Sequence, residues 1–308
     1  MNILGIGNAI IDVLCKVPDE FLTKNSLTKS TMKLVDEKEF KKLLSSLKIE
    51  ETISGGSVAN SIVGLAQLDN NVGFIGKVSN DEFGQKYENG LINEKVKYLY
   101  EKKEEKIPTG SCLILITPDS ERTMCTFLGT AGKINDTDIK KEYIQSAEII
   151  FLEGYLWDEG DPKKAFDKAI MHSKKIAMSL SDLFCVNRHK PHFLELVKNQ
   201  LNIIFANEQE ILSLIDAKDF QEAVSFSKQI KKNIVITRGD RGAISVNGDE
   251  IIEVNAQSDL NIKDLTGAGD LFAAGYLHGV INNLDTKECL IKGTELSSKI
   301  IQKIGARI

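Results

Sequence analysis

The sequence predicts an α/β protein in which helices cover both faces of a mainly parallel sheet. Between residues 140 and 240, short β-rich runs alternate with amphipathic helix patterns, which is the order of parallel strands joined by crossover helices. The 308 residues contain no internal repeat and no Pro/Ser-rich linker, so we expect a single domain over 1–308. Two regions, 9–36 and 97–130, are strand-rich with little helix between the strands. We expect these two regions to form a small β-sheet that acts as a lid.

Short β-rich runs give the expected strands, and apolar residues that recur every three or four positions give the expected helices. The expected strands are Asn2–Ile6, Val72–Ile75, Cys112–Thr117, Thr123–Leu128, Ile149–Leu152, Lys175–Leu180, Asn202–Ala206, Asn233–Thr237 and Ala243–Val246. The expected helices are Val58–Leu68, Asp81–Asn93, Pro162–His172, Glu208–Ile215, Phe220–Ile230, Gly267–Ile281 and Thr286–Ile304. Ser79 and Glu82 have the spacing of a capping box at the start of the second of these helices.

Composition excludes several classes of protein. A net charge of -5 without a basic stripe argues against a nucleic-acid partner. The 5 cysteines include no CxxC pair, which favours reduced thiols in a reducing compartment. The sequence shows no signal-peptide pattern, and no apolar run approaches the roughly 20 residues of a membrane helix. We therefore expect a cytoplasmic protein that binds neither nucleic acid nor membrane.

Familiar catalytic motifs of other enzyme classes are also missing from the sequence. There is no GxxxxGK[ST] stretch, which excludes a P-loop NTPase, and no GxSxG elbow of the common hydrolases. The 4 histidines form no HExxH motif, so the sequence gives no zinc site.

The segment Asp264–Gly275, with the sequence DLTGAGDLFAAG, is the most informative part of the chain. Gly267 and Gly269 bare the backbone just before an Ala-rich helix, whose first N–H groups would point outward at the positive end of the helix dipole. The amides of Gly267, Ala268 and Gly269 therefore predict an anion site. Asp270 lies in the same turn, and a carboxylate beside bound phosphate suggests a base that takes the proton of an incoming hydroxyl. A tight turn with an acidic first-turn residue would give the same short string.

Asn207 and Glu210 follow the expected strand Asn202–Ala206 and would share one face of a helix that starts there. An amide and a carboxylate at the carboxyl end of a strand suit hydrated Mg²⁺ on a phosphate. A helix cap followed by a first-turn Glu is the structural alternative for the same pattern.

Two further glycine-rich segments lie beside expected strands. Thr237–Gly242 is a hairpin loop that would also wall a nucleotide site. Gly55 and Gly56 open the first expected helix and would let a flat sugar approach the backbone. Asp12 interrupts an apolar run, where a carboxylate is costly unless it is bonded. Two vicinal sugar hydroxyls would satisfy it.

Together these segments resemble motifs of the ribokinase-like (PfkB) carbohydrate and nucleoside kinases, most of all the adenosine kinase branch. The matching segments are Gly55–Asn60 (GG-x-x-x-N), Asn207–Glu210 (NxxE), Thr237–Gly242 (TxGxxG) and Asp264–Asp270 (DTxGAGD). They occur in the family's order over nearly the whole chain. Val17–Leu22 and Pro108–Cys112 carry the similarity to adenosine kinases.

The resemblance implies a three-layer α/β/α fold with a small β-sheet lid, and phosphoryl transfer from Mg-ATP to a primary hydroxyl, with adenosine as the favoured acceptor. It implies that Asp270 is the base and that Gly267, Ala268 and Gly269 form the anion hole. Substrate-binding roles are implied for Asn8, Asp12, Gly55, Gly56 and Asn60. ATP-binding roles are implied for Asn207, Glu210, Thr237, Gly239, Gly242 and Thr266, with Mg²⁺ held by the first two through water. Purine- or sugar-packing roles, or plain core and lid roles, are open to Leu34, Leu113 and Tyr155.

Arg122, in the expected lid turn Ser120–Arg122, matches an arginine that adenosine kinases place near the transferring phosphate. Leu265 stands where the family usually has Thr or Val, which leaves open whether a monovalent cation binds near this loop and the 305–307 segment. The acceptor could also be ribose, fructose or a keto-deoxy sugar acid, and a non-catalytic nucleotide sensor is the alternative of another class. The intact Asp270 argues against a sensor. The sequence leaves monomer and homodimer open.

Overall fold

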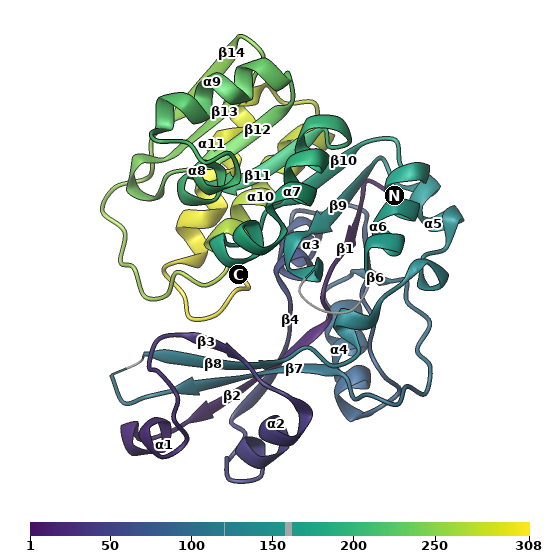
Figure 1. Ribbon diagram of the computed structural model, residues 1–308, viewed down its shortest axis with the longest axis vertical. Helices are drawn as coiled ribbons and strands as arrows, with labels where there is room; N and C mark the ends of the chain where they lie inside the picture. The colour runs from purple at the N-terminus through teal and green to yellow at the C-terminus, as the bar shows by residue number, and fades with distance from the viewer. Residues whose placement is uncertain (120, 158–161) are drawn as a thin grey trace.

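Two β-sheets organise the chain in the computed structural model, which describes residues 1–119, 121–157 and 162–308 (Figure 1). In spatial order, the strands of the larger sheet are β14 (Glu250–Val254), β13 (Ala243–Asn247), β12 (Asn233–Thr237), β11 (Ile203–Asn207), β10 (Ile176–Ser179), β9 (Ile149–Glu153), β1 (Ile3–Ile6), β5 (Val72–Ile75) and β6 (Lys97–Tyr98). From β12 to β6 every neighbouring pair is parallel, whereas β13 and β14 are antiparallel additions at one edge. The predicted, mainly parallel sheet is confirmed.

Helices cover both faces of this sheet because its central strands are apolar on both sides. All residues of β1, β5 and β9 are buried, and consecutive residues such as Ile3 and Leu4 belong to different core clusters. On one face pack α3 (Ser57–Gln67), α4 (Glu82–Asn93), α10 (Ala268–Ile281) and α11 (Thr286–Ile300). On the other face pack α5 (Lys141–Ser146), α6 (Lys163–His172), α7 (Leu183–Asn199), α8 (Glu208–Leu214) and α9 (Phe220–Ile230). This is the three-layer α/β/α arrangement expected from the sequence.

The second sheet lies beside the carboxyl ends of the parallel strands, at the lower end of Figure 1. Its order is β3 (Met32–Leu34), β8 (Arg122–Phe127), β7 (Gly110–Ile116), β2 (Ile10–Lys16) and β4 (Glu51–Gly55). Side chains alternate along its strands, so that Leu113 faces the core while Cys112 and Ile114 face the opposite way. Two helices, α1 (Asp19–Lys24) and α2 (Glu37–Leu44), add buried residues to the core-facing side.

The regions 9–36 and 97–130 supply most of this second sheet but not all of it. Strand β4 comes from outside them, and β6, inside the second region, joins the larger sheet instead. The polar sequence of β4, ETISG, carries little strand signal. Helix α7 was not predicted because Pro191 and the non-helical backbone at His189 interrupt its pattern.

The predicted cap of α4 was wrong in its residue. Asp81, not Ser79, is the N-cap, and its Oδ1 accepts a hydrogen bond from the Gly84 N–H at 2.8 Å. The backbone of Ser79 instead donates to Thr109 Oγ1 at 3.0 Å. Within the described part of the chain, no helix combines the length and the apolar character that a membrane crossing requires.

Helix α10 is held between α3 and α11 by very close contacts at glycines. A Cβ added at Gly275 would lie 2.3 Å from the carbonyl oxygen of Lys292 on α11. A Cβ added at Gly64 on α3 would lie 2.7 Å from Cδ1 of Leu271. Because these helices cannot move apart without losing buried contacts, the position of the first turn of α10 is fixed by packing.

We predict that Gly275→Ala lowers the free energy of unfolding by about 1–3 kcal/mol, because the new methyl group overpacks the α10–α11 contact. Gly269→Ala is the matched control on the same helix, since a Cβ there meets nothing within 4 Å. Chemical denaturation of both variants would measure the difference. Equal stability of the two variants would contradict the packing account.

Candidate active site

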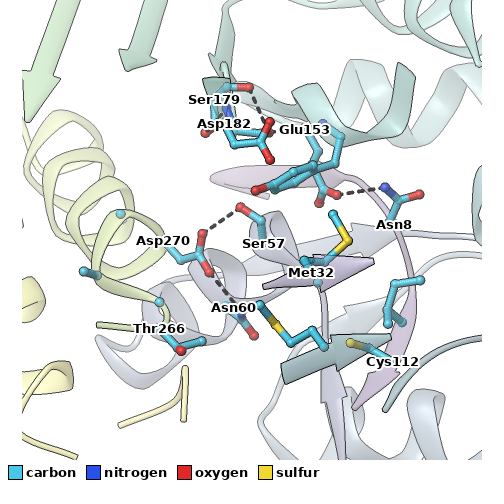
Figure 2. A pocket seen from close by; sticks show the side chains of 18 of the residues that line it. Asn8, Met32, Ser57, Asn60, Cys112, Glu153, Ser179, Asp182, Thr266 and Asp270 are labelled. Atoms are coloured by element: carbon cyan, nitrogen blue, oxygen red, sulfur yellow. Dashed lines mark hydrogen bonds between the residues drawn. The ribbon is translucent and has the colours of Figure 1, made fainter. Parts of the chain in front are cut away.

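A cavity of about 610 Å³ lies between the second sheet and the carboxyl ends of the parallel strands. Its walls contain most of the residues that the sequence singled out. These are Asn8, Asp12, Gly56, Asn60, Asn207, Glu210, Thr237, Thr266, Gly267, Ala268, Gly269 and Asp270. Four predicted site residues, Gly55, Arg122, Gly239 and Gly242, are not part of the cavity wall. Figure 2 shows the polar part of the site, where Asp270 points toward Ser57 and Asn60.

The amino end of α10 faces this cavity with a bare backbone. Gly267 is the N-cap in the left-handed region at φ 79°, and no side chain caps the helix. Within the described residues, the N–H groups of Gly267, Gly269 and Asp270 have no hydrogen-bond partner in the protein, whereas the Ala268 N–H donates to the Leu265 carbonyl at 3.2 Å. Of the three amides predicted for an anion site, those of Gly267 and Gly269 are free, and the third free amide is that of Asp270 and not that of Ala268. Free N–H groups at a helix start attract an anionic ligand.

Asp270 is held in place from α3. Its Oδ1 accepts a hydrogen bond from Ser57 Oγ at 2.6 Å, and its Oδ2 accepts one from Asn60 Nδ2 at 2.9 Å. Burial raises the pKa of Asp270 to about 6, although both hydrogen bonds favour the charged form. The carboxylate is thus ionised at neutral pH but basic enough to accept a proton, which is the property of a general base.

The start of α3, which also follows two glycines, lies at the cavity as well, but a carboxylate of the protein accepts one of its N–H groups. Glu153, the last residue of β9, accepts the Val58 N–H in the first turn of α3 at 3.1 Å and the Asn8 Nδ2–H at 3.1 Å. Burial raises the pKa of Glu153 to about 7. The Val58 N–H at the start of α3 is therefore already bound to a carboxylate of the protein. Glu153 is not among the predicted site residues, although a charged residue at the end of an apolar strand is a signal that the sequence contains.

Asp12 enters the cavity from β2, on the face of the second sheet turned away from its core. Burial raises the pKa of Asp12 to about 7, opposed by the positive charges of Arg307 and Arg122. Gly55 does not touch the cavity but lies under this carboxylate, since an added Cβ would be 2.4 Å from Asp12 Oδ2. At Gly56, φ is 101° and an added Cβ would be 2.3 Å from the Asn8 carbonyl oxygen. Both glycines therefore let the chain pass close to the side of the cavity that holds Asp12.

Asn207 and Glu210 form a capping box at the start of α8, as the structural alternative foresaw. Asn207 Oδ1 accepts the Glu210 N–H at 2.8 Å, and both carboxylate oxygens of Glu210 accept hydrogen bonds from Asn207. Burial raises the pKa of Glu210 to about 7. Among the described residues there is no group of three His, Cys, Asp or Glu side chains that could hold a metal ion directly. The residues fit Mg²⁺ only through its water shell.

Within the segment Thr237–Gly242, the residue that lines the cavity is Thr237, the last residue of β12. Arg241 in this loop binds Glu208 through an ion pair at 2.7 Å, which ties the loop to α8. Gly242 has φ 86°, and an added Cβ would be 2.0 Å from the Val254 carbonyl oxygen. Gly242 is therefore needed for the backbone path of the hairpin, which explains its place in the motif without a ligand contact. Gly239, at φ 62°, likewise lies in the turn of the loop.

Arg122 connects the second sheet to the loop before α10. Its Nη2 lies 3.1 Å from Oδ2 of Asp264, the first residue of the glycine-rich signature. Asp264 Oδ1 in turn accepts the Thr266 hydroxyl at 2.7 Å, which orients the loop from within. Ser120 of the expected lid turn lies outside the described residues.

The second sheet contributes an apolar wall opposite the polar groups. The wall consists of Ile10, Met32, Leu34, Cys112, Met124 and Leu128. Tyr155 also lines the cavity, from the 3₁₀ turn Gly154–Trp157 that follows β9. Leu113 does not, because it lies on the other face of the second sheet, and its suggested contact with a purine or sugar is wrong.

Comparisons with known proteins agree with the motifs. The sequence model of the pfkB family carbohydrate kinases matches residues 30–308. The chain is similar to the crystal structure of an adenosine kinase from Sinorhizobium meliloti, with 33% identity and a TM-score of 0.91 over 100% of this chain and 95% of that one. A probable sugar kinase from Rhizobium etli CFN 42 gives 34% identity and a TM-score of 0.89, covering 99% and 94%. The adenosine kinase of Saccharomyces cerevisiae is 26% identical over 97% of this chain and 94% of its own length. The resemblance drawn from the motifs and the predicted fold are confirmed.

We predict that Asp270→Asn stabilises the protein at about pH 8. The pKa of Asp270 is raised from 3.8 to about 6, so between these values the folded state holds a proton that the unfolded state releases. Above this window the buried charge lowers stability, by about 1–2 kcal/mol after allowance for solvent. Thermal unfolding should show a higher midpoint for the variant at about pH 8 and no difference near pH 4. A lower midpoint at about pH 8 would show that the bonds from Ser57 and Asn60 outweigh the burial of the charge.

Proposed function

The chain belongs to the pfkB family of carbohydrate kinases, and we propose that the hydroxyl it phosphorylates is the ribose 5′-hydroxyl of adenosine. It is an ATP-dependent kinase of the sugar and nucleoside class. The proposal narrows the acceptor to one nucleoside, which becomes AMP while ATP becomes ADP. The relatives from Sinorhizobium meliloti and Saccharomyces cerevisiae that are named adenosine kinases support this choice.

One observation carries the proposed chemistry: the Asp270 carboxylate and the free amides of the α10 start face the same cavity. The amides of Gly267 and Gly269 would hold the phosphoryl group as negative charge shifts during transfer. A carboxylate would weaken simple phosphate binding at that place. Its presence is explained if it accepts the proton of the attacking hydroxyl. This argument favours a kinase over a nucleotide sensor.

The proposed phosphoryl transfer requires only ATP, the acceptor hydroxyl and Asp270 as the proton acceptor. The acceptor oxygen attacks the γ-phosphorus in line, a new O–P bond forms, and the bond between that phosphorus and the bridging oxygen of ADP breaks. The proton of the hydroxyl moves to Asp270. A carboxylate has about four lone-pair sites, so the bonds from Ser57 and Asn60 leave room for the hydroxyl. The α3 side chains thus orient the base without blocking it.

The two sides of the cavity suit the two parts of a nucleoside. The apolar wall of the second sheet, which includes Met32 and Met124, would pack on the flat base of the nucleoside. A free sugar has no base that could make this contact. On the polar side, Asp12 and Asn60 would bind ribose hydroxyls. Asn8 Oδ1 is buried and has no hydrogen-bond partner among the described residues, so it is an open acceptor for a hydroxyl of the substrate.

ATP would approach the same cavity from the side of β11 and β12, with Thr237 and Thr266 at its phosphates. Magnesium would neutralise phosphate charge there, held through water by Asn207 and Glu210. Burial raises the pKa of Glu210 to about 7. A cation beside this side chain would favour its charged carboxylate form. The second sheet would act as the lid that excludes water from the transferred phosphoryl group.

We predict ADP release that depends on adenosine when a panel of nucleosides and free sugars is assayed with Mg-ATP. Asp270→Asn is the control for background ATP hydrolysis, because it keeps the shape of the site without the base. Release with ribose, fructose or a keto-deoxy sugar acid, and none with adenosine, would refute the proposed acceptor. Tight nucleoside binding without any turnover would support the sensor instead.

We predict that kcat/KM for the acceptor falls below a pH near the Asp270 pKa of about 6. The protonated form cannot accept the hydroxyl proton, so the rate constant should drop about tenfold for each further pH unit. Asp12 and Glu153, both with a pKa near 7, can extend the fall upward if their charged forms bind substrate. A profile that stays flat down to about pH 5 would contradict Asp270 as the base.

A further inference from the structure

The segment after α11, residues 305–308, is tied to the active site at several points. The Gly305 N–H donates to Asp264 Oδ2 at 2.8 Å, and the Ile308 carbonyl oxygen accepts a hydrogen bond from Gln67 Nε2 on α3 at 3.3 Å. A Cβ added at Gly267 would lie 2.8 Å from Cα of Ala306. The segment therefore packs against the start of α10 and reaches across to α3.

Arg307 in this segment contacts the group that holds the proposed base. Its Nε donates to Asn60 Oδ1 at 3.3 Å, and Asn60 Nδ2 donates to Asp270 Oδ2 at 2.9 Å. An amide has one accepting end and one donating end. With its oxygen bound to the guanidinium, Asn60 must turn its NH₂ group toward Asp270. The reverse orientation would set the amide oxygen against the Asp270 carboxylate and the NH₂ group against the donating guanidinium of Arg307.

Arg307 also places a positive charge among buried acids. The acidic groups whose charges act on Arg307 are Tyr87 and Glu94 from the side of α4, Asp12 from β2 and Asp270 from α10. Its charge opposes the effect of burial on the pKa of both Asp12 and Asp270. Its Nη2 is buried and makes no hydrogen bond within the described residues. Burial lowers the pKa of Arg307, but an arginine stays charged over the range in which carboxylates titrate.

We propose that Arg307 is a positioning residue of the kinase reaction, which fixes the amide of Asn60 so that its NH₂ group faces Asp270, and which places a positive charge one side chain away from that carboxylate. The proposal rests on the proposed function for its catalytic meaning. The sequence analysis names the 305–307 segment only for a monovalent cation, and no local pattern predicts the contact of Arg307 with Asn60, which lies 247 positions away in the chain. It differs from Arg122, which contacts the signature loop at Asp264, whereas Arg307 contacts Asn60, the amide that donates to Asp270.

The test is a titration of the unliganded protein by NMR with ¹³C-labelled aspartate carboxyl groups. Resonances of Asp12 and Asp270 are assigned by their loss in Asp12→Asn and Asp270→Asn. Arg307→Met removes the charge and the hydrogen bond, whereas Arg307→Lys keeps the charge and loses the Nε contact. Lys303→Met is the matched control, because it removes an exposed positive charge from the same end of the chain.

In Arg307→Met, the pKa of Asp270 and of Asp12 should rise by about half a pH unit or more. The low-pH fall of kcat/KM should move upward with them. In Arg307→Lys both pKa values should stay near those of the parent protein, while kcat falls about tenfold or more because the amide of Asn60 is no longer fixed. Lys303→Met should change neither property.

Unchanged pKa values in Arg307→Met would overturn the proposal, as would an equal rise in Arg307→Lys and Arg307→Met. A merely structural role would lower the unfolding temperature without moving either titration. If Arg307→Met does not fold, Arg307→Gln removes the same charge with a polar side chain and is read in the same way. The titration needs no turnover. A protein that is inactive toward every acceptor would therefore refute the proposed function, while the titration would still measure the effect of Arg307 on both acids.

Discussion

The structure depends on one electrostatic arrangement, in which a helix start that attracts negative charge lies beside a buried carboxylate. The first turn of α10 has free N–H groups at Gly267 and Gly269, and Asp270 follows them directly. Such an arrangement must be rigid, because a small rotation of the helix would aim the amides elsewhere. Close contacts of α10 with α11 and α3, at Gly275 and Gly64, supply that rigidity.

The same cavity collects several acids whose pKa values burial raises. Asp12, Glu153, Glu210 and Asp270 come from β2, β9, α8 and α10 and all line it. Buried acids without a full set of partners lower the stability of the folded state, so a fold does not gather them for packing. Each gains a partner if hydroxyls and a hydrated cation enter the cavity. These acids are consistent with the proposal that the substrates bind in this cavity.

The sequence was sufficient for the fold and for the residues whose role is local. Apolar strand runs and helix periods gave the layers, and glycine-rich motifs gave Asp270 with its neighbouring amides. It failed where the pattern was broken or the partner was distant. Helix α7 was not predicted because Pro191 lies inside it. The N-cap of α4 is Asp81 and not Ser79, because the choice between them depends on backbone geometry. Glu153 had a local signal as a charged residue at the end of an apolar strand, but its contact with α3, like that of Arg307, joins residues far apart in the sequence.

The central claim is that Asp270 removes a proton while the neighbouring amides hold the phosphoryl group. The most direct measurement is the single-turnover rate of phosphoryl transfer in Asp270→Ala, at saturating acceptor and with ATP affinity measured separately. The account predicts a rate about 10²–10⁴-fold lower than that of the parent protein, with an ATP dissociation constant changed by no more than about tenfold. A transfer rate close to that of the parent protein would contradict it.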